Sequence, residues 1–184
     1  MDGTRKMKYD KDLLMQKLVA HEGMRLDVYK DTLGINTIGI GRNLDDRGIT
    51  KDELDWMDYP SIEYVYSDGI TEADAIYLAQ NDVQIVEEEL LRAHPCVEDL
   101  DAVRQLVLVD MAFNLGVPRL NKFKKMWAAI HENKFDVAAK EMLDSRWANQ
   151  VKSRSTKLAH AMHHGECNGE RVDRQTKGVP SSSF

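Results

Sequence analysis

The longest run of helical periodicity in this sequence lies between residues 71 and 92. Thr71 is a suitable N-cap, and Asp74 stands at the third position of the helix that would follow it. Apolar residues then recur at intervals of three and four as far as Leu90. A chain of 184 residues can form one core, or a small lobe joined to a larger one. We therefore expect this helix to connect two lobes.

The residues before this helix have two patterns. Residues 10–20 have helical spacing and Gly23 is a plausible stop signal, so Glu22 should lie at or just beyond a helix end. From Arg25 to Ile40, β-branched residues and glycines indicate short strands with tight turns. This part of the chain therefore predicts one helix followed by a compact β-ribbon.

The rest of the chain is predicted to be helical. Thr50, with Glu53 three residues later, predicts a short helix near 51–58, whereas residues 59–69 fit no single pattern. Beyond Pro95, short connections separate helical segments, which implies that neighbouring helices pack together. These segments cover about 99–114, 120–131, 134–143, 145–150 and 154–164.

These patterns predict an α+β chain, with a small β-sheet lobe and a larger helical lobe joined by a long helix. A cleft between the lobes is the natural place for a ligand. The expected division of the single domain 1–184 is a β-containing lobe at about 12–70, the connecting helix at 71–92, a helical lobe at 93–165 and a tail at 166–184.

Composition excludes several classes of protein. No apolar run approaches the roughly 20 residues that cross a bilayer, and the charged start lacks a signal-peptide core, so we expect a cytoplasmic product and no membrane partner. Two cysteines do not make a disulfide framework, and reduced thiols are the simpler reading, although one bridge between Cys96 and Cys167 stays open.

The charge is distributed unevenly along the chain. The formal net charge is −6, but residues 115–184 carry 13 Lys and Arg against 7 Asp and Glu. Basic surface can attract polyanions such as nucleic acid or acidic wall polymers, and it can equally be an ordinary solvated helix face. Aromatic residues do not alternate with these charges as in a single-strand-binding groove, so no nucleic-acid partner is expected.

One hypothesis for the C-terminal region is a metal-binding site. His160, His163, His164 and Cys167 cluster in sequence, and two of the histidines are four residues apart, a spacing that can suit zinc. The alternative is that the histidines interact with the negative end of the last helix dipole. The segment "HEGMR" is not the zinc-protease signature, because Arg25 stands where that signature needs a second histidine.

Two carboxylates and a hydroxyl lie close together in the segment "EGMRLDVYKDTLGINTIGIG". They belong to Glu22, Asp31 and Thr37. Glycoside hydrolysis generally needs two carboxyl groups, one that donates a proton and one that activates water or attacks the anomeric carbon. Spacing alone does not distinguish this chemistry from acids on a solvated surface, because the chain has 31 acidic residues.

This segment resembles the catalytic signature of the phage-type lysozymes, the glycoside hydrolase family 24 endolysins that include the T-even phage lysozyme. In that signature a Glu, eight residues, an Asp, five residues and a Thr follow one another, and the match continues through the run from Thr37 to Gly41. Later segments, including "LDAVRQLVLVDMAFNLG", resemble helices of the same family, so the resemblance covers roughly residues 12 to 165. It implies a lysozyme-like fold with the active site in the cleft.

The resemblance also implies a mechanism. Glu22 would protonate the glycosidic oxygen of the β-1,4 bond between N-acetylmuramic acid and N-acetylglucosamine in peptidoglycan. Asp31, helped by Thr37, would hold the attacking water on the opposite face and invert the anomer. Inversion needs room for that water, so the two carboxyl groups should be about 6.5 to 9.5 Å apart. No cofactor and no metal are implied.

Substrate contacts are implied for Asn114, Arg154 and Leu44. Arg154 matches a family arginine near the catalytic glutamate, and a cation there would favour the ionised acid, so burial must offset it. Asn114 stands where relatives commonly have a longer amide that could bind the acetamido group of a sugar. Trp147 is expected to pack in the core beneath the cleft.

Some residues depart from the family pattern. Arg42 stands where relatives often have histidine, and His21 stands where the T-even enzyme has an acid. Both could change the field around Glu22 and so the pH optimum. Residues 45–70 also differ from the T-even enzyme in length and content.

The resemblance leaves three functions open. The first is a monomeric phage endolysin that lyses the host, made in the host cytoplasm and reaching the periplasm and cell wall through a holin-made hole. The second is a lysozyme-like module built into a virion. The third, a lytic transglycosylase, classically relies on one glutamate and would leave Asp31 and Thr37 unexplained.

Overall fold

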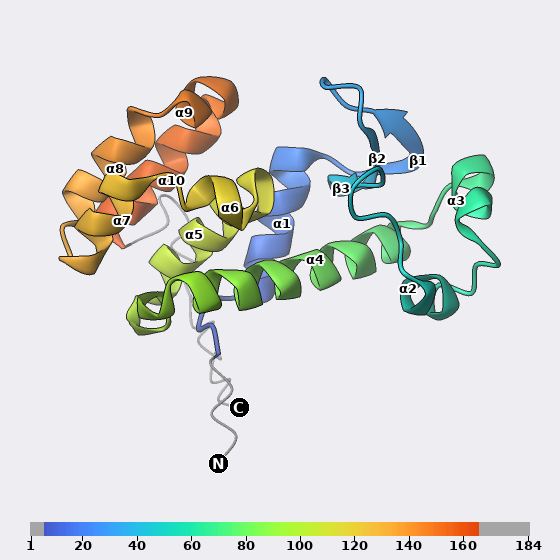
Figure 1. Ribbon diagram of the computed structural model, residues 1–184, viewed down its shortest axis with the longest axis horizontal. Coiled ribbons are helices and arrows are strands. Elements are labelled where there is room, and N and C mark those ends of the chain that lie inside the picture. Colours follow the sequence, from blue (N-terminus) through green and yellow to red (C-terminus); the bar gives the residue numbers. More distant parts are fainter. Residues whose placement is uncertain (1–5, 166–184) are drawn as a thin grey trace, which may run out of the picture.

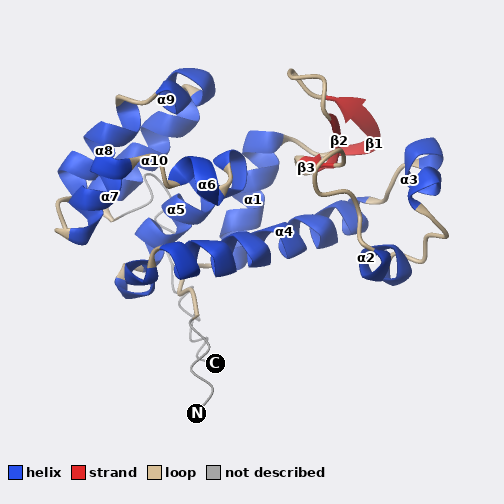
Figure 2. Ribbon diagram, in the orientation of Figure 1, coloured by secondary structure: helices blue, strands red, loops and turns tan. Residues whose placement is uncertain are grey.

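Helices dominate the structure, a computed structural model that describes residues 6–165, and they accompany one small antiparallel sheet (Figure 2). The fold is therefore of the α+β class. The tail at 166–184 lies outside the described residues. The elements are α1 (Lys11–Glu22), β1 (Arg25–Lys30), β2 (Asn36–Gly39), β3 (Arg42–Asn43), α2 (Lys51–Trp56), α3 (Ile62–Asp68), α4 (Glu72–Ala93), a 3-10 helix η1 (Pro95–Asp99), α5 (Ala102–Leu115), α6 (Val117–Leu120), α7 (Lys124–His131), α8 (Phe135–Leu143), α9 (Arg146–Val151) and α10 (Ser153–His164).

Helix α4 runs between two groups of elements (Figure 1). On one side lie the three strands with α2 and α3, and on the other lie α5 to α10. Its N-terminus is fixed by a capping box, in which Thr71 accepts the N–H of Asp74 and the Asp74 carboxylate accepts the N–H of Thr71. The helix predicted over residues 71–92 is thus confirmed as an element.

The sheet has the strand order β1-β2-β3, and both pairs are antiparallel. Tyr29 lies opposite Thr37 in the β1–β2 pair, and the register shifts between Tyr29 and Arg25. Glycines at 39 and 41 have positive φ values, 64° and 75°, which allow the chain to turn tightly between β2 and β3. The sheet is therefore small, with a tight turn between its last two strands.

The apolar residues form two cores. The larger core unites α4 and the helices after it, and the smaller core lies between the sheet, α2, α3 and the start of α4. Helix α1 contributes Leu14 and Leu18 to the larger core, because its apolar side chains face α4 and α5. Helix α1 therefore packs with the helical part of the molecule, although it precedes the sheet in sequence.

Two details of the helix prediction were wrong. The helix predicted over about 120–131 begins at Lys124 instead, because Phe123 has the non-helical ψ of 56°, and the short helix α6 that precedes it was not predicted. The helix predicted from about 99 begins at Ala102 instead, where Asp101 accepts the N–H of Arg104 as an N-cap. Among the described residues, no helix combines the length and apolar character that a bilayer crossing requires.

Candidate active site

Glu22 is the last residue of α1 and faces the turn between β2 and β3. The helix stops there because Gly23 has a φ of 76°, which glycine adopts without strain. A Cβ atom placed on Gly41 would lie 3.7 Å from Glu22 Oε2. The Glu22 side chain is 20% exposed, so it is partly buried and still accessible.

Two side chains from the helical lobe hold Glu22 Oε1. Arg154 Nη1, on α10, donates to it at 2.6 Å, and Asn114 Nδ2, on α5, donates at 3.2 Å. Trp147 Nε1 donates in turn to Asn114 Oδ1 at 2.9 Å, which fixes the orientation of that amide. The predicted position of Arg154 beside Glu22 is confirmed, and Trp147 is buried as expected.

Asp31 and Thr37 are joined through the backbone of Ile35. Asp31 Oδ1 accepts the N–H groups of Leu33 and Ile35 at 2.8 and 2.9 Å, whereas Thr37 Oγ1 donates to the Ile35 carbonyl at 3.1 Å. Thr37 is only 5% exposed, because β2 lies between β1 and β3. The hairpin therefore fixes both residues relative to one another.

The charges of Glu22 and Asp31 both affect the pKa of Tyr29. Burial raises the pKa of Tyr29, Arg25 opposes that rise, and the negative charges of Glu22 and Asp31 add to it. Tyr29 lies opposite Thr37 in the β1–β2 pair, and Asp31 directly follows β1, so Asp31 and Thr37 lie at the same end of the hairpin.

Asp110 extends this group into the protein interior, and the sequence patterns did not single it out. It is fully buried on α5, its Oδ1 accepts Arg154 Nε at 2.9 Å, and its Oδ2 lies 3.3 Å from His21 Nδ1. A single acid within the apolar run "LVLVDMAF" was the signal that could have identified it. His21, which stands where the T-even enzyme has an acid, therefore faces the carboxylate of Asp110.

Arg42 and Leu44 are placed in the interior of the small lobe. The Arg42 guanidinium is 2% exposed and pairs with Glu53 at 2.9 Å and with Asp82 at 2.8 Å, so its charge is balanced locally. This pairing argues against the expected influence of Arg42 on the field at Glu22. Leu44, predicted to contact substrate, is 6% exposed and packs in the small core, so its side chain offers little surface to a ligand.

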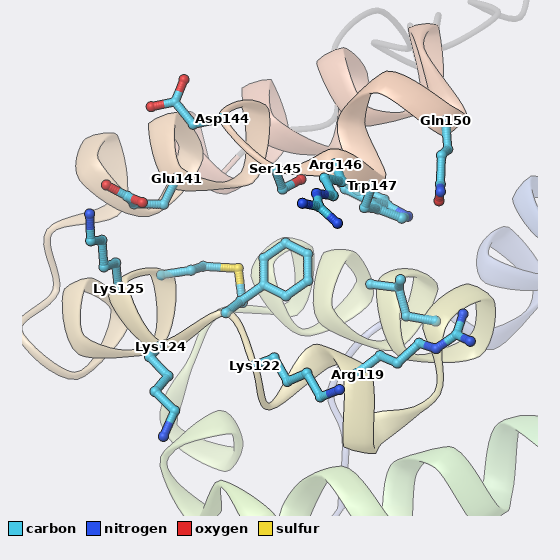
Figure 3. Close-up of a pocket in the computed structure, with 13 residues that line it drawn as sticks. Arg119, Lys122, Lys124, Lys125, Glu141, Asp144, Ser145, Arg146, Trp147 and Gln150 are labelled. Carbon is cyan, nitrogen blue, oxygen red and sulfur yellow. The ribbon is translucent and has the colours of Figure 1, made fainter.

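A cavity of about 860 Å³ lies in the helical lobe next to Trp147 (Figure 3). Its cations include Arg119 and Lys122 on one side, and its two acids, Glu141 and Asp144, lie on the other. Phe123, Met126 and Leu115 complete an apolar lining. Part of the basic charge of the C-terminal region is therefore gathered around this cavity.

The C-terminal histidines follow one another on α10. The rings of His160 and His164 stack with centroids 4.0 Å apart, and His164 Nδ1 lies 3.0 Å from the His160 carbonyl oxygen. Within residues 6–165 no group of three or more His, Cys, Asp and Glu side chains is arranged to hold a metal ion. Cys167 lies outside the described residues, as does any bridge from it to Cys96.

Two carboxylates beside a hairpin, at the junction of a small β lobe and a helical lobe, are the groups that glycoside hydrolysis generally uses. The chain belongs to the phage lysozyme family, whose sequence model matches residues 19–161. The chain has the lysozyme-like α+β fold of that family and is a lysozyme-type glycoside hydrolase that acts on peptidoglycan.

Relatives agree with this assignment. The protein named Probable T4-type lysozyme 2 of Dictyostelium discoideum is 30% identical over 165 residues, which cover 83% of this chain and 94% of that protein. Probable T4-type lysozyme 1 of the same organism is 28% identical over 164 residues, or 80% of this chain and 91% of that protein. The Pre-baseplate central spike protein Gp5 of Enterobacteria phage T4 is 28% identical over 178 residues, which cover 89% of this chain and 30% of that protein.

Proposed function

We propose that this lysozyme hydrolyses the β-1,4 bond between N-acetylmuramic acid and N-acetylglucosamine with inversion, using Glu22 as the acid. Asp31 and Thr37 position the attacking water. The observation that carries this proposal is that Glu22 adjoins the same small sheet whose hairpin holds Asp31 and Thr37 through the backbone of Ile35. Two carboxyl groups facing one bond are what glycoside hydrolysis requires.

The hydrogen bonds at Glu22 support its role as the proton donor. Arg154 and Asn114 both donate to Oε1, so Oε2 is the oxygen that can carry a proton towards a sugar. Gly41 borders Oε2, and its lack of a side chain keeps that approach open. The proton would pass from Oε2 to the glycosidic oxygen as the bond to the anomeric carbon breaks.

Asp31 is arranged to act on water. Its Oδ1 is occupied by two backbone N–H groups, and Oδ2 accepts no hydrogen bond from the described residues. A water held by Oδ2 and by Thr37 would attack the anomeric carbon on the face opposite Glu22. This geometry requires a separation of about 6.5 to 9.5 Å between the carboxyl groups, which stays a prediction. Asn114 would contact the acetamido group of the sugar through its amide.

Replacing Glu22 with Gln tests the acid role. The amide cannot donate a proton with a carboxylic acid's ease, so the release of reducing ends from purified peptidoglycan should fall by a factor of about 100 or more. Asp31→Asn should also lower turnover strongly, whereas Glu89→Gln, an exposed acid on α4, should leave it unchanged. Parental rates in Glu22→Gln would refute the acid role.

The products distinguish the mechanisms. An inverting hydrolase releases the opposite anomer first, which proton NMR of the initial fragments detects, and a retaining enzyme releases the original anomer. A lytic transglycosylase would release fragments with an anhydro ring and no free reducing end. We expect the inverted anomer with a free reducing end.

For the biological role, we propose a monomeric endolysin that lyses the host at the end of phage infection. It would be made in the host cytoplasm and would reach the periplasm and wall after a holin opens the membrane. Support comes from the family, which is named for phage lysozymes. Release of reducing ends from wall material by the purified chain, and lysis of host cells only when a holin is co-expressed, would test this role.

A virion-associated lysozyme is the second candidate. The match to a phage spike protein, which extends over 89% of this chain, specifically favours it. Mass spectrometry of purified virions separates the two candidates, because a free endolysin should be absent from washed particles. Its stoichiometric presence there would favour the virion role.

A further inference from the structure

A buried carboxylate lies behind Glu22 and joins three helices. Asp110 on α5 accepts a hydrogen bond from Arg154 on α10 and lies 3.3 Å from His21 on α1. The His21 contact lacks hydrogen-bond geometry, so Asp110 Oδ2 accepts no hydrogen bond within the described part of the chain. A buried carboxylate is costly unless it is paired, so this one must have a compensating partner.

That partner is the guanidinium of Arg154. Its Nε and Nη2 both lie 2.9 Å from Asp110 Oδ1, whereas its Nη1 donates to Glu22 at 2.6 Å. A guanidinium is planar and its N–H groups have fixed directions. Once Asp110 holds the Nε and Nη2 edge, Nη1 must point at Glu22.

The charges in this cluster suggest a second effect. Arg154 is only 6% exposed, and a buried cation needs an anion nearby. If Glu22 were its sole partner, protonation of Glu22 would leave that cation uncompensated. Asp110 supplies the counter-charge independently, so Glu22 can hold a proton and lose it during each turnover.

We propose that Asp110 is a positioning residue of this lysozyme, which orients Arg154 towards Glu22 and balances its charge while Glu22 is neutral. His21 borders the other oxygen of Asp110 and completes the enclosure of that carboxylate. The proposal rests on the role of Glu22 as the acid. Asp110 itself touches no substrate, since it is fully buried.

The groups that face Glu22 determine how the rate should depend on pH. Arg154 approaches from α10, the neutral amide of Asn114 from α5, and Tyr29 from β1. Asp31 acts on the same tyrosine from the end of β1. In Asp110→Asn, Arg154 would lose its Asp110 partner and would interact more strongly with Glu22, so the alkaline limb of the pH–rate profile should move to lower pH.

Asp110→Asn tests the proposal, with Asp82→Asn as its matched control. Asp82 is also a buried aspartate between two basic side chains, Arg42 at 2.8 Å and Arg47 at 2.7 Å, but it lies on α4 and, among the described residues, makes no hydrogen bond or ion pair with Arg154 or Glu22. Both variants lose one buried charge, and both should lose stability. Only Asp110→Asn should change catalysis.

For Asp110→Asn we expect kcat on purified peptidoglycan to fall between about tenfold and a hundredfold, with a much smaller change in KM. The alkaline limb of its pH–rate profile should move to lower pH by about one unit. Asp82→Asn should keep the alkaline limb of the pH–rate profile at the parental pH. Equal effects in the two variants, or a change confined to KM, would overturn the proposal.

A double variant, His21→Asp with Asp110→Asn, returns a carboxylate to the same cluster from α1. It should recover the parental alkaline limb and most of kcat, and it keeps the test decisive if Asp110→Asn alone does not fold. A folded double variant that shows no recovery of the limb contradicts the role of the counter-charge.

Nitrogen-15 NMR provides a measurement that does not depend on activity. The Nε–H of Arg154 should be protected from solvent exchange in the parent and in Asp82→Asn, and should exchange faster in Asp110→Asn. Protection in all three would show that Asp110 does not hold Arg154. If the parent released no reducing ends, the proposed function would fail, while this comparison would still decide the positioning role.

Discussion

Individual residues here act mainly through the partners that fix them. Glu22 is held by an arginine and an amide, and Asp31 is held by two backbone N–H groups. Such fixed donors cost no reorganisation at the moment of reaction. Preorganisation of the acid pair is therefore a property of its neighbours.

Glu53 is the residue with the clearest consequence for stability against pH. Burial tends to raise its pKa, but hydrogen bonds from Arg42, Asn81 and the Thr50 N–H lower it to about 2, from a usual value of 4.5. A carboxylate with a lowered folded-state pKa stabilises the fold above its unfolded-state pKa. That contribution is lost as the pH falls from about 4.5 towards 2.

We expect the parent to lose on the order of 2 kcal/mol more unfolding free energy between pH 5 and pH 2.5 than Glu53→Gln does. Urea unfolding at a series of pH values measures this difference. The exposed Glu89→Gln should follow the parent curve. Parallel curves for the parent and Glu53→Gln would show that Glu53 contributes nothing to acid sensitivity.

The positions of His21 and Asp110 show what the sequence could not predict at this scale. They are far apart in the chain, and their contact arises only when α1 and α5 pack together. The resemblance predicted Arg154 beside Glu22, yet it gave no partner for the other edge of the guanidinium. Local patterns contain no information about a pair formed by tertiary packing.

At the scale of elements, caps made the helix starts predictable. Thr50 and Thr71 both form capping boxes, as their spacing to Glu53 and Asp74 indicates. Helix α3 lay in the segment that fitted no pattern, and its N-cap Ser61 makes no capping hydrogen bond. The two capping boxes therefore marked the starts of α2 and α4 correctly, whereas α3, which has no such local signal, was missed.

Thr71→Ala should destabilise the protein by about 1 kcal/mol, because the first turn of α4 loses the oxygen that accepts the N–H of Asp74. Ser61→Ala is the matched control, since Ser61 occupies the same position in α3 without that bond, and it should change stability by less than about 0.5 kcal/mol. Chemical denaturation measures both. If the two variants lost the same unfolding free energy, the capping bond of Thr71 would not be what stabilises the start of α4.

At the scale of the whole molecule, the two cores differ in size. The larger core includes Leu106, Leu108 and Met111 of α5, all buried, whereas the smaller one depends on few residues such as Ile38 and Val65. A smaller apolar core provides less free energy against local opening.

We expect amides of β2 and α3 to exchange with solvent through an opening that leaves α5 folded. Native-state hydrogen exchange in low denaturant should give a lower opening free energy for these elements than for α5. One common opening free energy for both groups would instead show that the molecule unfolds as a single unit.

Glu22 and Asp31 are attached to different halves of the molecule. Glu22 is attached to a helix that packs in the larger core, and Asp31 follows a strand of the smaller lobe. In the proposed mechanism, the room for the attacking water depends on how far apart the two halves stand, so bending of the molecule should tune turnover. Covalent linkers of graded length across the halves should show an optimum span for kcat, and a flat response would exclude such mechanical control.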